Sequence, residues 1–248
     1  MPEPVLETIG LTKRIGGLLA TDRVSLRVGV GELHAVIGPN GAGKTTLVSQ
    51  LAGELAPDAG RVLFEGPGVT AEPPHRRAAR GLIRSFQVTS VFPEFSALDN
   101  VAMAVQAQQG SARFWRPARR DPALREPARA RLAELGLDGR ADILAGMLSH
   151  GERRTLELAM ALAAHPRALL LDEPLAGMGT EEAARMIRLL ATLKGRFGVL
   201  LIEHDMDAVF ALADRITVLA AGRVIASGEP ESVRRDPAAR AAYLGEDA

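Results

Sequence analysis

Apolar and polar positions along the chain follow two alternating patterns. Short runs of apolar residues, many of them β-branched or leucine, are separated by longer Ala-, Leu- and Arg-rich stretches of helical character. The continuous apolar runs at 33–38, 169–172 and 199–203 are typical of strands that are buried on both faces of a mainly parallel sheet. The pattern therefore predicts an α/β fold.

Further strands are expected towards both ends of the sequence. Segments 5–11, 24–30 and 60–65 are interpreted as antiparallel strands. Segments 216–220 and 223–227 flank Gly222 and predict a hairpin.

Strand signals vanish between residues 96 and 146, which predicts a helical subdomain inserted in the α/β body. Within it, residues 111–131 hold seven arginines, three prolines, Phe114 and the single tryptophan. Basic residues beside aromatic ones can mark a nucleic-acid or membrane surface. A solvated helical face with an irregular connector is the alternative, and we favour it.

Composition narrows the classes of function. The 248 residues carry 30 Lys and Arg against 30 Asp and Glu, and 47% are hydrophobic, so wholesale disorder is excluded. The balanced charge argues against bulk attraction to nucleic acid or anionic lipid. Without cysteine there is no disulfide, thiolate zinc site or cysteine nucleophile.

The longest apolar run, 158–164, is far shorter than the ~20 residues that cross a bilayer. The N-terminus lacks a secretory pattern, so a cytoplasmic protein is expected.

The clearest chemical motif follows the first predicted parallel strand. It satisfies the P-loop pattern and precedes a helix predicted at 44–52 and ended by Gly53. Its glycines let backbone N–H groups turn towards phosphate oxygens, the helix N-terminus adds partial positive charge, and Lys44 is one of only three lysines. Thr45 offers a hydroxyl to Mg²⁺. The predicted nucleotide contacts are Gly38, Pro39, Asn40, Gly41, Ala42, Gly43, Lys44, Thr45 and Thr46.

A second motif, Leu-Leu-Leu-Asp-Glu-Pro at 169–174, ends another predicted buried strand. Hydrolysis of a bound nucleotide needs a carboxylate near Mg²⁺ and a group that deprotonates or positions water. Asp172 is the candidate for the first role and Glu173 for the second. Taken alone, the motif is also compatible with a strand that leaves the core through an acidic turn.

Three further motifs occur around these two. They are Arg84-Ser-Phe-Gln87, Leu148-Ser-His-Gly-Glu152 and Leu201-Ile-Glu-His-Asp205. Together the five motifs resemble the nucleotide-binding domain of ATP-binding cassette (ABC) transporters over nearly the whole chain. The resemblance implies a P-loop NTPase with a mainly parallel core sheet. It also implies an N-terminal antiparallel β subdomain and a single ABC domain over 1–248, with a helical subdomain at about 96–165 inserted in a RecA-like core.

The resemblance also implies roles for individual residues. Gln87 matches the glutamine that contacts Mg²⁺ and the attacking water, and His204 matches the histidine that contacts the γ-phosphate. Ser149 and Gly151 match signature residues that bind the ATP held by a second ABC subunit. Ser149 and Glu152 equally predict a helix-capping box, and the two interpretations are compatible. The implied magnesium set is Thr45 and Gln87 directly, with Asp172 acting through water.

The chain departs from the family pattern at several positions. His150 and Glu152 replace the usual glycine and glutamine of the signature, and residues 176–179 read Ala-Gly-Met-Gly in place of Ser-Ala-Leu-Asp. No aromatic residue stands where adenine is often stacked, so Arg14 is a candidate to stack there instead. These variants and the Gly-Glu-Pro-Glu sequence at 228–231 resemble the subgroup that serves importers of branched-chain amino acids, urea and amides.

The implied protein is the ATP-hydrolysing subunit of a multi-subunit importer on the cytoplasmic face of the inner or plasma membrane. Its expected partners are a second ABC subunit, identical or paralogous, transmembrane permeases and, indirectly, a substrate-binding protein. Phe92, Pro93 and Phe95 either line a groove for a permease loop or pack in the core.

Two alternative functions stay open: a soluble ABC ATPase acting on nucleic acid or the ribosome, and a nucleotide-gated regulatory module. A GTPase is disfavoured because no Asn-Lys-x-Asp motif occurs. The solute is not determined by the sequence.

Overall fold

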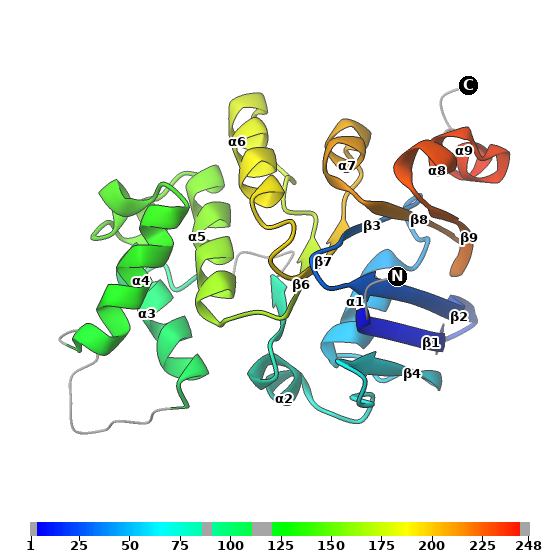
Figure 1. Ribbon diagram of the computed structural model, residues 1–248, viewed down its shortest axis with the longest axis horizontal. Coiled ribbons are helices and arrows are strands. Elements are labelled where there is room, and N and C mark those ends of the chain that lie inside the picture. The colour runs from blue at the N-terminus through cyan, green and yellow to red at the C-terminus, as the bar shows by residue number, and fades with distance from the viewer. Residues whose placement is uncertain (1–3, 86–90, 111–120, 244–248) are drawn as a thin grey trace. The chain divides into compact units, whose positions relative to one another are not determined.

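The computed structural model describes residues 4–85, 91–110 and 121–243, with the side chain of residue 243 excepted. It divides into two compact units (Figure 1). The first contains Met1–Arg84, Arg167–Glu173 and Leu190–Ala248, and the second contains Ser85–Pro166 and Pro174–Leu189. The proposed boundaries of the helical subdomain, 96–165, stay a prediction.

The first unit contains an antiparallel sheet of three strands in the order β2-β1-β4. The strands are β1 (Pro4–Ile15), β2 (Leu18–Gly29) and β4 (Ala59–Phe64). The antiparallel strands predicted for this part of the chain are confirmed, although β1 and β2 extend further than expected and meet at a hairpin around residues 16–17. Leu6, Val24 and Val62 are fully buried on this sheet.

A second sheet in this unit has the order β5-β6-β7-β3-β8-β9. Strands β6, β7, β3 and β8 are parallel, and β9 closes the hairpin predicted around Gly222. Every residue of β3, β6 and β7 is buried, as their continuous apolar runs require. The strands are β3 (Leu33–Ile37), β5 (Leu82–Ser85), β6 (Ala168–Asp172), β7 (Gly198–Ile202), β8 (Arg215–Ala220) and β9 (Arg223–Gly228).

Helix α1 (Lys44–Ala52) has the predicted bounds and begins directly after the glycine-rich loop. Leu47, Val48 and Leu51 are fully buried in a core that also contains residues of both sheets. Gly53 ends the helix in the left-handed conformation. The core thereby fixes the helix whose first turn forms part of the candidate phosphate site.

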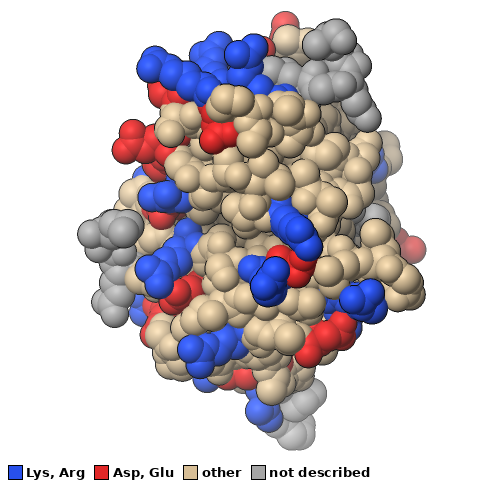
Figure 2. Space-filling model, turned by 90° about the vertical axis from the view of Figure 1, so that its right-hand side faces the viewer, with Lys and Arg blue, Asp and Glu red and all other residues tan. Residues whose placement is uncertain are grey.

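The other helices of the first unit are short, and they lie between or after the strands. They are α2 (Pro74–Ala79), α7 (Met206–Leu212), α8 (Pro230–Arg235) and α9 (Pro237–Tyr243). In the face shown in Figure 2, basic side chains lie beside acidic ones at several separate places, between broader areas of other residues. Among the described residues, no helix is long and apolar enough to cross a membrane.

The second unit is helical. Helices α3 (Ala97–Gln108), α4 (Pro122–Glu134) and α5 (His150–Ala163) pack on one another (Figure 1). In its described part the unit also contains the short 3₁₀ turns η2 (Asp138–Arg140) and η3 (Ala145–Met147), and most of α6 (Thr180–Ala191). Ser96, Asp121 and Ser149 cap α3, α4 and α5 with their side chains.

The basic stretch at 111–131 is described only from residue 121 onward. Arg125 is paired with Asp99 at 2.9 Å, Arg131 with Glu134 at 2.6 Å, and Arg129 lies 3.9 Å from Asp142. These acidic neighbours favour the solvated-face interpretation for the described part. Phe114 and Trp115 lie outside the described residues.

Candidate functional site

The glycine-rich loop at 38–43 connects β3 to α1 in the first unit. Gly38 and Gly43 have φ angles of 149° and 99°. A Cβ atom at Gly38 would overlap the carbonyl oxygen of Leu219, and one at Gly43 would overlap that of Ala20. Glycine is therefore required at both positions by conformation and by space. Gly222, in the β8–β9 turn, donates its N–H to the Ala42 carbonyl at 3.0 Å, which braces the loop.

Lys44 lies at the start of α1 and is only 9% exposed. Its ammonium donates to the carbonyls of Gly38 at 2.6 Å and Pro39 at 3.0 Å. Burial lowers the pKa of Lys44, and the nearby carboxylates Glu173 and Asp172 oppose that effect. The ammonium is thus held inside the loop by acceptors that an anionic ligand could replace. Thr45 is exposed and Thr46 half-buried in the same turn.

Asp172 is the last residue of β6, and its side chain is fully buried. One carboxylate oxygen, Oδ2, accepts a hydrogen bond from Arg84 at 2.8 Å. The other, Oδ1, is buried without a hydrogen-bond partner among the described residues. Burial raises the pKa of Asp172, and the Arg84 guanidinium opposes that rise.

Glu173 is half-buried and has a φ of 52°, in the left-handed region that non-glycine residues rarely adopt. Its N–H donates to the carbonyl of Ile202 at 2.9 Å, so the end of β7 holds the backbone of Glu173. A strained backbone that the surrounding structure enforces is common at functional sites. Glu173 directly follows the last residue of β6, so it lies just beyond the carboxyl end of the parallel sheet.

His204 follows β7 by two residues and its side chain is 68% exposed. The strands β3, β6 and β7 run parallel, so their carboxyl ends lie at the same edge of the sheet. Asp172 ends β6, and the glycine-rich loop, Glu173 and His204 come shortly after strand ends at this edge. Ligands of open α/β sheets bind at this edge. Gln87 lies outside the described residues, so its role stays a prediction.

The oxygen donors fit a magnesium ion that is shared with nucleotide phosphates. Thr45 offers a hydroxyl, and Asp172 offers an oxygen to which no residue of the described part donates a hydrogen bond. No group of three or more His, Asp or Glu side chains that could hold a metal occurs in the described part of the chain. A divalent cation here would therefore take most of its ligands from phosphate and water.

The signature residues lie in the second unit, where the predicted capping box at Ser149 and Glu152 is confirmed. The Ser149 hydroxyl donates to Glu182 of α6 at 3.1 Å. A Cβ atom at Gly151 would lie 2.5 Å from the Glu182 carboxyl carbon. Glu182 therefore lies against both residues that the family resemblance assigns to the second ATP.

Two of the departures from the family pattern meet in space. His150 donates its Nε2–H to the Ala176 carbonyl at 3.0 Å, and a Cβ atom at Gly177 would lie 3.2 Å from the same nitrogen. The histidine thus fills the place beside Gly177 and links the start of α5 to the segment after Glu173. The sequence reveals each departure separately, but not their contact.

Sequence reasoning missed Arg84 and Glu182. Both are common residue types in an Arg- and Glu-rich chain, and Arg84 precedes a motif whose notable residue is Gln87. The exposed Arg14 lies at the end of β1, and its backbone N–H donates to Asp58 at 2.7 Å. Its stacking on adenine stays a prediction.

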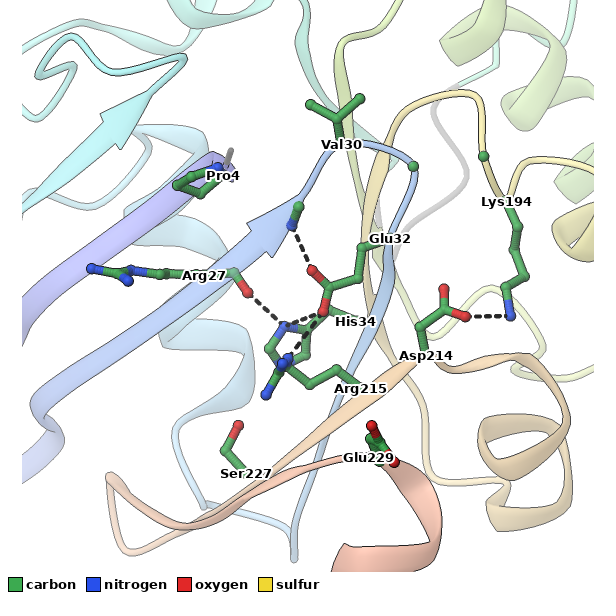
Figure 3. A pocket seen from close by; sticks show the side chains of 13 residues that line it. Pro4, Arg27, Val30, Glu32, His34, Lys194, Asp214, Arg215, Ser227 and Glu229 are labelled. Carbon is green, nitrogen blue, oxygen red and sulfur yellow. Dashed lines mark hydrogen bonds and ion pairs between the residues drawn. The ribbon is translucent and has the colours of Figure 1, made fainter. Parts of the chain in front are cut away.

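A cavity of about 760 Å³ lies elsewhere in the first unit (Figure 3). Its charged residues include the pairs Arg215–Glu32 at 3.1 Å and Lys194–Asp214 at 2.8 Å. The buried His34 donates its Nδ1–H to the Arg27 carbonyl at 2.8 Å. These residues surround the beginnings of β3 and β8, whereas the glycine-rich loop follows the other end of β3. The cavity is therefore separate from the candidate phosphate site.

Comparison with protein families gives two matches. Residues 21–176, more than half of the chain, match the family described as ABC transporter. Residues 223–248 match the family described as branched-chain amino acid ATP-binding cassette transporter.

Three relatives illustrate the range of similar proteins. The high-affinity branched-chain amino acid transport ATP-binding protein BraF of Pseudomonas aeruginosa is 38% identical, covering 99% of this chain and 100% of the relative. LivG of Escherichia coli K12, which has the same description, is 36% identical over the same shares. The lipopolysaccharide export system ATP-binding protein LptB of Acidithiobacillus ferridurans is 38% identical, covering 90% of this chain and 89% of the relative.

Solved structures agree with the sequence relatives. A nucleotide-free ATP-binding cassette from an ABC transporter superposes with a TM-score of 0.86 and 29% identity, covering 97% of this chain and 99% of that one. An ATP-binding cassette in its ADP conformation superposes with a TM-score of 0.85 and 30% identity, covering 98% and 99%. The predicted fold class and the family resemblance are confirmed. This chain belongs to the ABC transporter family, as one of its ATP-binding cassettes.

Proposed function

We propose that the chain binds Mg-ATP at the carboxyl edge of its parallel sheet and hydrolyses it to drive an importer. The observation that carries the proposal is the convergence of four groups at this edge. They are the glycine-rich loop, the buried ammonium of Lys44, the Asp172 oxygen that has no hydrogen-bond partner in the described part of the chain, and the strained Glu173.

Lys44 would exchange the Gly38 and Pro39 carbonyls for the β- and γ-phosphates as nucleotide enters. Glu173 would accept a proton from the attacking water, and His204 would donate a hydrogen bond to the γ-phosphate. Thr45 and Gln87 would hold the magnesium ion directly, and Asp172 would hold it through water. Bound there, Mg²⁺ supplies positive charge beside the phosphates.

The signature residues imply a second ABC subunit. Ser149 and Gly151 would contact the γ-phosphate of the ATP held by an identical or paralogous partner, because a capped helix N-terminus is an anion site. Glu182 would then leave the position that it holds beside Ser149. ATP binding would favour the closed dimer, and hydrolysis would release it.

The solute would be a branched-chain amino acid or a related small polar or amide solute. Two relatives named for branched-chain amino acid transport cover nearly the whole chain, and the end of the chain matches a family of that description. A relative named for lipopolysaccharide export is equally similar in identity over a shorter length, so the assignment depends on the match at 223–248. The chain would act on the cytoplasmic face of the inner or plasma membrane, beside permeases and, indirectly, a substrate-binding protein.

Replacing Glu173 with glutamine tests the core of the proposal. Glu173→Gln keeps the shape of the side chain but cannot take a proton, so steady-state phosphate release should fall about 100-fold or more. The variant should accumulate an ATP-bound dimer, seen by solution scattering with saturating Mg-ATP and the cognate permease. Normal turnover would remove Glu173 from catalysis, and isolated protomers alone would contradict the dimer. Glu126→Gln, an exposed change of the same kind on α4, is the control.

A further inference from the structure

Arg84 joins two parts of the first unit that the proposed mechanism uses, α1 and the end of β6. It lies on β5, three residues before Gln87 in the sequence. Its Nη2 donates to Asp172 at 2.8 Å, while Nη1 donates to Ser49 of α1 at 3.1 Å and also to Glu54, just beyond the end of α1. The Arg84 side chain is only 9% exposed. The guanidinium of Arg84 thus connects the C-terminal part of α1 with the end of β6.

The geometry at Asp172 is asymmetric. Arg84 contacts Oδ2 alone and leaves Oδ1 buried without a hydrogen-bond partner among the described residues. The strong arrangement for arginine and carboxylate is a bidentate pair in which both oxygens accept hydrogen bonds, and Arg84 does not form it with Asp172. The Nε of Arg84 is also buried, and no described residue offers it a hydrogen bond. The Arg84–Asp172 pair therefore forms fewer hydrogen bonds than a bidentate pair would. It leaves Oδ1 of Asp172 able to accept a hydrogen bond from another group.

We propose that Arg84 is a positioning residue for the magnesium site, an inference that rests on the proposed function. It fixes Asp172 through Oδ2 so that Oδ1 can accept a hydrogen bond from water on the ion. Because Nη1 is anchored by Ser49 and Glu54, the orientation of Asp172 is tied to the helix that carries Lys44 and Thr45. Partners of this outer kind contribute about 10- to 100-fold to metal affinity or activity.

The decisive measurement separates magnesium-dependent binding from nucleotide binding itself. A fluorescent ATP analogue is titrated into the full chain once with EDTA and once with Mg²⁺, for the wild type, Arg84→Gln and Arg84→Lys. We expect Arg84→Gln to bind normally with EDTA and to lose about 10- to 100-fold of the tightening that Mg²⁺ produces. Arg84→Lys should recover part of it, because one ammonium cannot span Asp172 and both anchors of Nη1.

Two further variants guard against trivial explanations. Arg80→Gln removes an arginine whose ion pair with Glu72 lies nearer the surface, and it should leave both titrations unchanged. Glu54→Gln weakens the anchor of Nη1 without touching Asp172. It should bind normally with EDTA and lose part of the magnesium effect of the wild type, though less than Arg84→Gln loses, and an unchanged magnesium effect would contradict the proposal. Glu54→Gln keeps the proposal testable if Arg84→Gln does not fold.

The alternatives give different results. Equal weakening with EDTA and with Mg²⁺ would mean that Arg84 is only a structural brace, and it would overturn the proposal. Tighter Mg-ATP binding in Arg84→Gln would mean that the guanidinium competes with the ion, which overturns it as well. If the wild type itself fails to bind the analogue, the proposed function fails, and that result is distinct from either.

Discussion

At the residue scale, Lys44 shows how a buried cation is kept ready for an anion. The side chain is 9% exposed, yet its ammonium is satisfied by two loop carbonyls, at 2.6 and 3.0 Å. An unpaired buried charge would be costly, so the loop stabilises the ammonium until a ligand replaces the carbonyls. The same ammonium lies near Glu173 and Asp172, whose negative charge raises its pKa against the effect of burial.

Lys44→Ala should therefore weaken ATP binding. Loss of a charge-assisted contact to phosphate corresponds to about 1.5–3 kcal/mol, or roughly 10- to 150-fold in affinity. A fluorescent-ATP titration measures the change. Lys194→Ala is a matched control, because this lysine pairs with Asp214 at the opposite edge of the sheet. Undiminished affinity in Lys44→Ala would contradict the phosphate site.

At the scale of elements, α5 begins with a network that combines local and distant contacts. The Glu152 carboxylate accepts the Ser149 N–H at 2.9 Å and pairs with Arg140 at 2.7 Å. The hydrogen bond from the Ser149 backbone is the largest cause that lowers the pKa of Glu152, and Arg140 adds to it. Glu152, one of the residues that depart from the family pattern, thus stabilises the start of α5.

The pH dependence of stability should show this contribution. A carboxyl group whose pKa is lowered by folding stabilises the protein above its unfolded pKa, about 4.3 for Glu, and the effect is lost as pH falls through the folded pKa. Glu152→Gln should lower the free energy of unfolding at pH 7, and the difference from the wild type should shrink below about pH 4. Urea unfolding at several pH values measures it. A difference that stays constant down to pH 3 would argue against the ionised cap, and Glu126→Gln is the exposed control.

At the scale of the whole molecule, partner contacts would require a surface that the isolated chain leaves open. In the second unit, Phe92, Phe95, Leu144 and Met147 are 52%, 38%, 48% and 78% exposed. They are held near one another, because Ala145 donates its N–H to the Phe95 carbonyl and the two Phe rings lie 5.8 Å apart. This exposure favours the predicted permease contact over core packing for Phe92.

Met147→Asp should reduce the stimulation of ATP hydrolysis by the cognate permease, because a charge would be buried against the apolar contact. We expect about a tenfold loss of apparent permease affinity, with unchanged hydrolysis by the isolated chain. ATPase assays with and without permease in vesicles measure both. Ile225→Asp, on the exposed face of β9, is the control. Stimulation that is normal in Met147→Asp would place the permease contact elsewhere.

Short-range physics makes several features predictable from the sequence alone. Four features depend only on residues within a few positions of one another. They are the bounds of α1, the buried parallel strands, the β8–β9 hairpin and the capping box at Ser149. Strand β5 was missed because four residues at the edge of a sheet give too short an apolar pattern.

Only the tertiary structure pairs Arg84 with Asp172, 88 positions away, Ser149 with Glu182, 33 away, and His150 with Ala176, 26 away. Sequence supplies the charged and polar groups, but it does not state which distant group each will face. That choice follows from the order of the strands and the direction in which each element presents its side chains. The sequence by itself therefore determined the glycine-rich loop and the family. The tertiary structure decided which distant residues contact Asp172 and the signature residues.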